Sequence, residues 1–175
     1  IDLLKREELT VLNTISTAEG AIQIAMEEST KTLHGSKILV MGFGRVSKIL
    51  SNMLKGIGAE VYCETRTTVN CAWIKAYGYK PILLDELDDE LNQFDIIINT
   101  IPHIILNKEK LKLLKRDSLI IDIASNPGGV DRNAAKEIGI KLIWALSLPG
   151  RVAPITSAEF IKETLENILK DIKNN

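Results

Sequence analysis

The sequence has few cysteines, few aromatic residues and no excess of either charge. Its 175 residues include two cysteines and 5% aromatic side chains, and 22 Lys and Arg stand against 23 Asp and Glu. Two cysteines, Cys63 and Cys71, cannot form a disulfide framework, so we expect both to be reduced. A net charge of -1 provides no basic stripe to neutralise the phosphates of a duplex. The composition therefore argues against nucleic-acid binding.

Long apolar runs and chemical signature motifs are also missing. No run approaches the roughly 18 to 20 apolar residues that cross a bilayer, so we expect no membrane span. No HExxH, paired-cysteine or GxxxxGK[ST] pattern occurs, which leaves metal, hydrolytic and NTP chemistry unsupported. The chain begins with the charged segment IDLLKREELTVL and has no initiator Met. We interpret residues 1–12 as a linker from a missing amino-terminal domain and residues 13–175 as one domain.

Short aliphatic runs alternate with segments of helical period, which is the pattern of a parallel α/β sheet. Several runs are apolar throughout, as expected for strands covered on both faces. The six runs cover residues 37–42, 59–65, 81–84, 94–100, 118–124 and 141–146. The sequence therefore predicts an α/β Rossmann-type, doubly wound parallel sheet of six strands in the order 3-2-1-4-5-6.

Helix starts are predicted from capping residues. Ser16-Thr17-Ala18-Glu19 and Thr156-Ser157-Ala158-Glu159 have the spacing of capping boxes, and they predict flanking amino- and carboxyl-terminal helices. Asn107 and Asp131 are predicted to cap the helices KEKLKLLK and RNAAKEI.

The segment Gly42-Phe43-Gly44-Arg45-Val46-Ser47 lies where the first strand meets a helix. The first glycine permits a tight turn, and the second lets the backbone approach a pyrophosphate at the helix N-terminus. Ser47 stands where a third glycine is usual, and its small side chain still allows close packing. This segment predicts a dinucleotide-binding turn.

The residues at the end of the second strand indicate which dinucleotide the protein binds. Proteins that hold NAD usually place an acid there for the ribose hydroxyls, and Thr65 occupies that position here. Arg66 and Thr67 follow, and a guanidinium with hydroxyls suits a 2′-phosphate. We therefore prefer NADP(H) to NAD(H). Glu64 comes one residue early and should point to the other side of the strand, but a register shift of one residue would favour NAD(H).

Other strand ends should meet the same edge of the sheet. Thr100, Ile101 and Pro102 follow the fourth strand and are predicted to border the cofactor. Ser125 and Asn126, in a turn rich in Gly and Pro, are predicted to lie near the nicotinamide. His103 is a weak candidate for proton transfer, since a loop histidine is more often an ordinary surface residue.

The sequence resembles the family of dipicolinate synthase A subunits from about Asn13 to the last helix. The segments IIDIASNPGGVD and LPGRVAPIT are the most particular to that family, beside HGSKILVMGFGRVSKIL, ETRTT and INTIP. The family's cofactor motif falls on Gly42, Gly44 and Ser47, with Arg66-Thr67 as its basic strand end.

The resemblance implies the cofactor-binding domain of an oxidoreductase that forms dipicolinate from a tetrahydrodipicolinate-type precursor with NADP or NAD. It further implies that the protein acts on a dicarboxylate substrate in the mother-cell cytoplasm during sporulation. The implied partner is a flavoprotein-like B subunit, and the resemblance leaves open whether the protein also forms a homo-oligomer. Glu19 as a base and Arg151 as a partner for the substrate carboxylate are weak catalytic candidates. Two alternatives remain: a methylenetetrahydrofolate- or shikimate-type dehydrogenase domain, and a non-catalytic dinucleotide-sensing domain.

Overall fold

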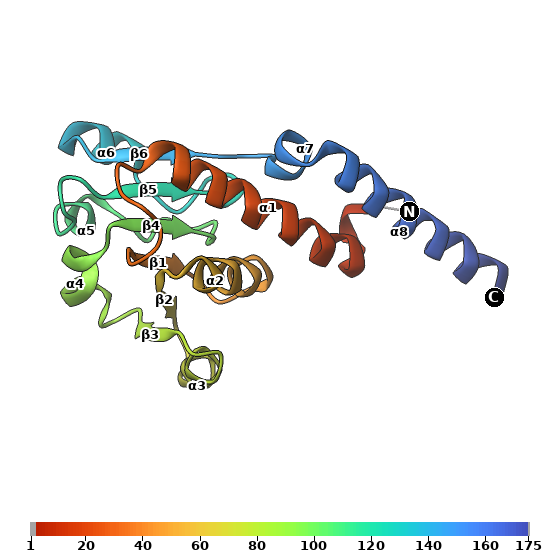
Figure 1. The fold of residues 1–175 in the computed structure, drawn as a ribbon, viewed down its shortest axis with the longest axis horizontal. Helices are drawn as coiled ribbons and strands as arrows, with labels where there is room; N and C mark the ends of the chain where they lie inside the picture. Colours follow the sequence, from red (N-terminus) through yellow and green to blue (C-terminus); the bar gives the residue numbers. More distant parts are fainter. Residues whose placement is uncertain (1–2, 175) are drawn as a thin grey trace.

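The computed structural model describes residues 3–174, which form a parallel six-stranded sheet with helices on both faces (Figure 1). The strand order is β3-β2-β1-β4-β5-β6, and each neighbouring pair runs parallel. The strands are β1 (Lys37–Met41), β2 (Glu60–Thr65), β3 (Lys80–Leu83), β4 (Ile96–Asn99), β5 (Leu119–Asp122) and β6 (Lys141–Trp144). This confirms the predicted Rossmann-type sheet and its strand order.

The helices form two layers and a carboxyl-terminal extension. They are η1 (Leu3–Lys5), α1 (Glu7–Glu28), α2 (Arg45–Ile57), α3 (Thr68–Ala76), α4 (Leu87–Glu90), η2 (Leu91–Gln93), α5 (Lys108–Leu111), α6 (Arg132–Ile138), α7 (Leu148–Val152) and α8 (Pro154–Asn174). Helices α1, α2 and α3 pack on one face of the sheet, and α4, α5 and α6 pack on the other. Helix α8 extends beyond the sheet (Figure 1). Within residues 3–174, no helix combines the length and apolar character that a bilayer span requires.

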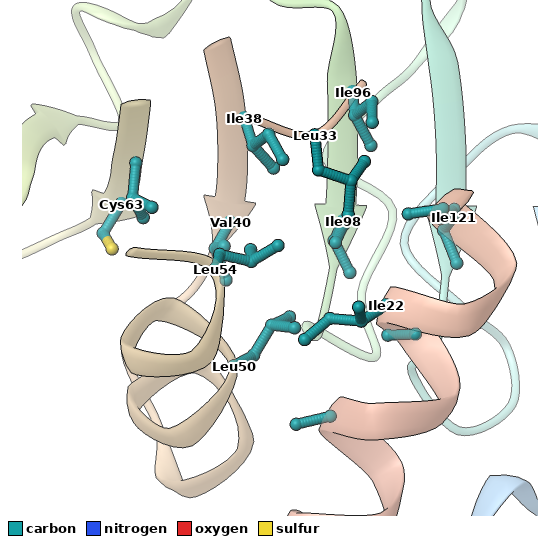
Figure 2. Close-up of a cluster of buried hydrophobic side chains, with 14 of the residues drawn as sticks. Ile22, Leu33, Ile38, Val40, Leu50, Leu54, Cys63, Ile96, Ile98 and Ile121 are labelled. Atoms are coloured by element: carbon teal, nitrogen blue, oxygen red, sulfur yellow. The ribbon is translucent and has the colours of Figure 1, made fainter. Parts of the chain in front are cut away.

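Alternate residues along the strands pack into two separate hydrophobic cores, one on each face of the sheet. Ile38 and Val40 of β1 face the helix layer that contains Ile22 of α1 and Leu50 of α2 (Figure 2). The intervening Leu39 belongs to the core on the other face. A fully buried aliphatic side chain of this size stabilises the fold by about 1.5 to 3 kcal/mol. Both cores therefore hold the central strands firmly, which fixes the positions of their carboxyl ends.

Two of the predicted helix starts are correct. Asn107 Oδ1 accepts from the backbone N of Lys110 at 3.0 Å, and Asp131 Oδ1 accepts from the backbone N of Ala134 at 3.0 Å. The helix after Asn107 is shorter than predicted, because regular α-helix ends at Leu111.

Both predicted capping boxes are wrong. Helix α1 begins at Glu7, so Ser16–Glu19 lie in its interior, and residues 7–12 of the expected linker form its first turns. Thr17 Oγ1 donates to the carbonyl of Asn13 at 2.8 Å instead of capping a helix. Helix α8 begins at Pro154, a residue suited to a first helical position, before the predicted box. The pattern S/T-x-x-E is also compatible with a helix interior, and only the backbone upstream decides between the two.

Candidate functional site

The carboxyl ends of β1, β2 and β4 surround a cavity of 280 Å³. In a sheet of this order, β1 and β4 form the topological switch point, where open α/β sheets bind their ligands. The residues that line the cavity are Gly42, Phe43, Gly44, Glu64, Thr65, Arg66, Thr67, Asn70, Thr100, Ile101 and Pro102. The cavity thus joins the glycine-rich turn, the end of β2 and the loop after β4.

The two glycines of the glycine-rich turn differ in the space that surrounds them. Gly42 has φ +89°, and a Cβ there would come within 2.9 Å of Ile101 Cγ1 and of Thr100 Oγ1. A Cβ at Gly44, the N-cap of α2, would meet nothing within 4 Å. No side chain caps α2, so its first-turn N–H groups can bind a ligand anion.

Ser47 joins α2 to the loop after β4. The Ser47 Oγ lies 2.9 Å from Thr100 Oγ1, which itself donates to the carbonyl of Met41 at 2.8 Å. Because Thr100 uses its proton on Met41, the Ser47 hydroxyl is the donor in this pair. Ser47 is fully buried, so a small residue in place of the usual third glycine allows the helix to pack closely.

The end of β2 presents several hydrogen-bond donors to the cavity. Thr65 Oγ1 accepts from Asn70 Nδ2 at 3.1 Å, and Thr67 Oγ1 caps α3 by accepting from the backbone N of Asn70 at 3.2 Å. Both hydroxyls still have their own protons to donate. Arg66 is exposed and forms no salt bridge with any residue between 3 and 174. This wall therefore favours an anionic group.

Glu64 is a lining residue that the sequence did not identify as part of the site. Its side chain is 1% exposed, and Oε2 accepts from the backbone N of Gly42 at 3.0 Å. Oε1 has no hydrogen-bond partner among the described residues. Burial raises the pKa of this carboxyl, although the Gly42 N–H and the Arg66 charge act in the opposite direction. The pairing of Glu64 with Met41, next to Gly42, explains the contact with the turn.

A second buried carboxylate fixes the loops after β4 and β5. Asp122 accepts from Asn99 Nδ2 at 2.7 Å, from the backbone N of Gly129 at 2.8 Å and from that of Ala124 at 3.1 Å. Asn99 Oδ1 also accepts from the backbone N of Ile101 at 3.2 Å. A Cβ at Gly129 would collide with Asn99 and with the carbonyl of Ile101, so this close approach requires glycine. The network therefore sets the path of Ile101 beside the cavity.

Several predicted cofactor residues lie outside the cavity lining. The Arg45 guanidinium binds Glu7 of α1, with Nε–Oε1 at 2.6 Å and Nη2–Oε2 at 2.9 Å. Val46 follows in the same helical turn and does not line the cavity. Ser125 and Asn126 are exposed in the loop after β5. Ser47, buried against Thr100, is not a lining residue either. The cavity therefore contains the expected glycines and the end of β2 without these five side chains.

The structure does not bring the three weak catalytic candidates into this cavity. Glu19 is exposed on α1, His103 is exposed after Pro102, and Arg151 is exposed on α7. Among residues 3–174, no group of three or more His, Cys, Asp or Glu side chains could hold a metal ion. The described chain thus offers a binding site, without an evident acid–base pair inside it.

Comparisons with known proteins agree with this architecture. Residues 12–135 match the family described as D-isomer specific 2-hydroxyacid dehydrogenase, NAD binding domain. The chain is 36% identical over 173 residues to the dipicolinate synthase A subunit of Bacillus subtilis (strain 168), covering 99% of this chain and 58% of that protein. It therefore spans somewhat more than half the length of this relative.

Solved structures show the same similarity. The crystal structure of the dipicolinate synthase A chain from Bacillus subtilis superposes with a TM-score of 0.96 at 36% identity, covering 99% of this chain and 58% of that one. The dipicolinate synthase A subunit from Bacillus halodurans gives a TM-score of 0.94 at 33% identity, with 97% and 58% coverage. A transhydrogenase from Sinorhizobium meliloti, at 21% identity and a TM-score of 0.80, covering 95% of this chain and 57% of that one, shares the fold.

Proposed function

Because the chain belongs to the family of NAD-binding domains of D-isomer specific 2-hydroxyacid dehydrogenases, we propose that it binds a nicotinamide dinucleotide. We further propose that it binds NADP(H) in preference to NAD(H). The cofactor would occupy the cavity at the carboxyl ends of β1, β2 and β4. A nicotinamide dinucleotide agrees with the family, and the preference for the phosphorylated form is inferred from the end of β2.

The observation that carries this proposal is the set of donors at the end of β2. Thr65 stands where a ribose-binding acid is usual, and its hydroxyl proton is free for a ligand. Arg66 and the Thr67 hydroxyl line the same cavity. A phosphate ester carries a charge of about −1.5 to −2 at neutral pH and accepts charge-assisted hydrogen bonds, which a guanidinium makes well. These three groups therefore suit a 2′-phosphate better than a ribose hydroxyl.

The remaining contacts follow from the same geometry. The uncapped first turn of α2, beginning at Arg45, would hold the pyrophosphate, and Gly44 leaves space for it. Thr100, Ile101 and Pro102 would border the cofactor along the loop after β4. Ser125 and Asn126 would approach the nicotinamide half. When bound, the dinucleotide supplies a hydride acceptor, and this chain holds and orients it.

We also propose that the chain is the cofactor-binding part of an oxidoreductase similar to the dipicolinate synthase A subunit. The support is the similarity over 99% of the chain to that protein. The expected reaction forms dipicolinate from a tetrahydrodipicolinate-type dicarboxylate during sporulation, in the mother-cell cytoplasm, and the expected partner is a flavoprotein-like B subunit. Glu19, His103 and Arg151 stay weak candidates for proton transfer and carboxylate binding.

The cofactor proposal is tested by titrating the protein with NADPH and NADH. In Arg66→Ala, we expect the Kd for NADPH to rise about 10- to 100-fold, since a hydrogen bond to a charged group contributes about 1.5 to 3 kcal/mol. The Kd for NADH should change less than about threefold in the same variant, because no phosphate contact is lost. Arg116→Ala, an exposed arginine before β5 at the opposite end of the strands, is the control. Equal affinities of wild type and Arg66→Ala for NADPH would contradict the preference.

The reaction is tested with the intact protein together with its partner. We expect the intact assembly to reduce NADP when supplied with a tetrahydrodipicolinate-type substrate. Turnover of a folate or shikimate substrate instead would favour a dehydrogenase of one of those types. Tight NADPH binding without turnover of any of these substrates would favour a sensing role.

A further inference from the structure

Aromatic side chains are few in this chain, and half of them form one connected group. The chain has three Phe, two Trp and three Tyr. Four of these rings make up the group, namely Phe43, Trp73, Tyr77 and Tyr79. The ring centroid of Tyr77 lies 6.2 Å from that of Phe43, 5.9 Å from that of Trp73 and 6.0 Å from that of Tyr79. Tyr77 is therefore the central ring, and Phe43 is the member that lines the cavity.

Phe43 supplies the one side chain of the turn Gly42-Phe43-Gly44. Glycine allows a wider range of backbone conformations than any other residue, so the two glycines leave this turn free to take several paths. Gly42 is held, because its backbone N donates to Glu64 and the loop after β4 leaves no space for a Cβ. Gly44 has open space where a side chain would be. The path from Gly42 to α2 therefore depends on what holds the Phe43 ring.

Tyr77 and Lys48 both pack against the Phe43 ring, which is 8% exposed. The Tyr77 ring is tilted by 49° to it, and Lys48 Nζ of α2 lies 5.4 Å from its centroid. Tyr77 is the C-cap residue of α3, and its carbonyl accepts from Lys55 Nζ of α2 at 2.8 Å. Tyr77 thus joins the end of α3 to the glycine-rich turn.

The beginning of α3 also belongs to the cavity. Thr67, the N-cap residue of α3, and Asn70 in its first turn both line the cavity. Helix α3 therefore contacts the site at both of its ends, directly through its first residues and indirectly through Tyr77 and Phe43. The second contact has no role in the cofactor contacts described above.

We propose that Tyr77 is a positioning residue for dinucleotide binding. It holds Phe43, and through Phe43 it holds the glycine-rich turn in the path that presents the first turn of α2 to the pyrophosphate. This inference rests on the proposed binding of a dinucleotide in the same cavity. Because the pyrophosphate is common to NADP(H) and NAD(H), Tyr77 acts on the affinity for both cofactors and leaves the preference between them unchanged.

The experiment measures the Kd of the intact protein for NADPH and NADH in Tyr77→Ala. Tyr77 is 46% exposed, so its truncation should leave the fold intact. Without the ring, the turn takes several paths, and only the fraction with the binding path is competent. We expect both Kd values to rise by the same factor, about 3- to 10-fold, which corresponds to an aromatic pair of ordinary strength.

Two variants of the same helix are the controls. Tyr77→Phe keeps the ring and removes a hydroxyl that donates to no residue between 3 and 174, so it should retain the wild-type Kd values. Trp73→Ala removes an exposed ring that stacks on Tyr77 and not on Phe43, and it should change the Kd values by less than about twofold. An increase equal to that of Tyr77→Ala in either control would overturn the proposal.

A double-mutant cycle tests whether Tyr77 acts through Phe43. In the Phe43→Ala background, Tyr77→Ala should change the Kd values by less than about twofold, because the interaction is already lost. The same increase as in the wild-type background would overturn the proposal. An increase below about threefold for Tyr77→Ala alone, or an increase in the Kd for NADPH only, would also overturn it.

Hydrogen exchange of the protein without ligand covers the case in which the double variant does not fold. The backbone N–H of Gly42 is hydrogen-bonded to Glu64, so residues 42–44 contain a protected amide. In Tyr77→Ala, these residues should exchange at least about threefold faster than in wild type, and saturating NADPH should restore protection. Equal exchange in wild type and Tyr77→Ala rejects the role of Tyr77. Failure of wild type to bind either cofactor rejects the proposed function instead.

Discussion

Replacing Asp122 with alanine should strongly destabilise the protein. The carboxylate is 2% exposed and accepts hydrogen bonds from the backbone N of Gly129, the backbone N of Ala124 and Asn99 Nδ2. Asn99 Nδ2 also donates to the carbonyl of Ile101 and would keep that bond, but the two backbone N–H groups would be buried without acceptors. Each such orphaned donor costs about 1 to 3 kcal/mol, so we expect the free energy of unfolding to fall by about 3 to 5 kcal/mol.

Urea unfolding followed by far-UV circular dichroism measures this loss. With a slope of about 2 kcal/mol per molar urea, typical of small domains, the midpoint should fall by about 2 M. Asp122→Asn keeps one acceptor oxygen and should lose less, about 1 to 3 kcal/mol.

Asp117→Ala is the control, because Asp117 is 61% exposed and pairs with Lys31 at the surface. We expect that variant to lose less than about 1 kcal/mol. A loss below about 1 kcal/mol for Asp122→Ala, or one no larger than that of the control, would refute the assignment of Asp122 as the anchor of the two loops.

Two further predictions concern the turn and the opposite end of the sheet. Gly42→Ala should lower the free energy of unfolding by about 2 to 4 kcal/mol, because it combines a positive φ with a clash against the loop after β4. A Cβ at Gly44 meets nothing, so Gly44→Ala should lower the free energy of unfolding by less than about 1 kcal/mol while still weakening dinucleotide binding. Equal melting temperatures for the two variants would contradict this view. Burial by itself would raise the pKa of Asp95, but hydrogen bonds from two lysines and a backbone N–H outweigh burial and lower it to about 2, below the ordinary 3.8. The contribution of Asp95 to the free energy of unfolding, about 2 kcal/mol, should be complete above pH 4 and lost as pH falls toward 2. Asp95→Asn should remove that part of the acid dependence of unfolding.

The sheet could be predicted well because its information is local and repeated. Runs such as KILVM and DIIIN are long enough for one buried strand each, and the right-handed crossover rule leaves few possible strand orders. The glycine-rich turn was predictable for the same reason, since Gly42 and Gly44 follow a strand and precede a helix.

The side-chain partners in the site could not be predicted, because they depend on contacts between distant segments. Arg45 belongs to the glycine-rich motif, yet its guanidinium binds Glu7, 38 positions earlier. Alternation along β2 places Glu64 and Thr65 on opposite faces, but both line the cavity because the strand ends there. Neither fact follows from the spacing of residues.

The central place of β1 has a consequence for how the chain folds as it emerges from the ribosome. β1 pairs with β2 on one side and with β4 on the other, so the half-sheet made first has an open edge until residues 96–99 are synthesised. The cavity needs Thr100 to Pro102 from this later segment. A nascent chain that ends before them can pair three strands, but it cannot yet gain stability from bound dinucleotide. The first half of the domain therefore has no stabilisation from bound dinucleotide until the fourth strand has paired with β1.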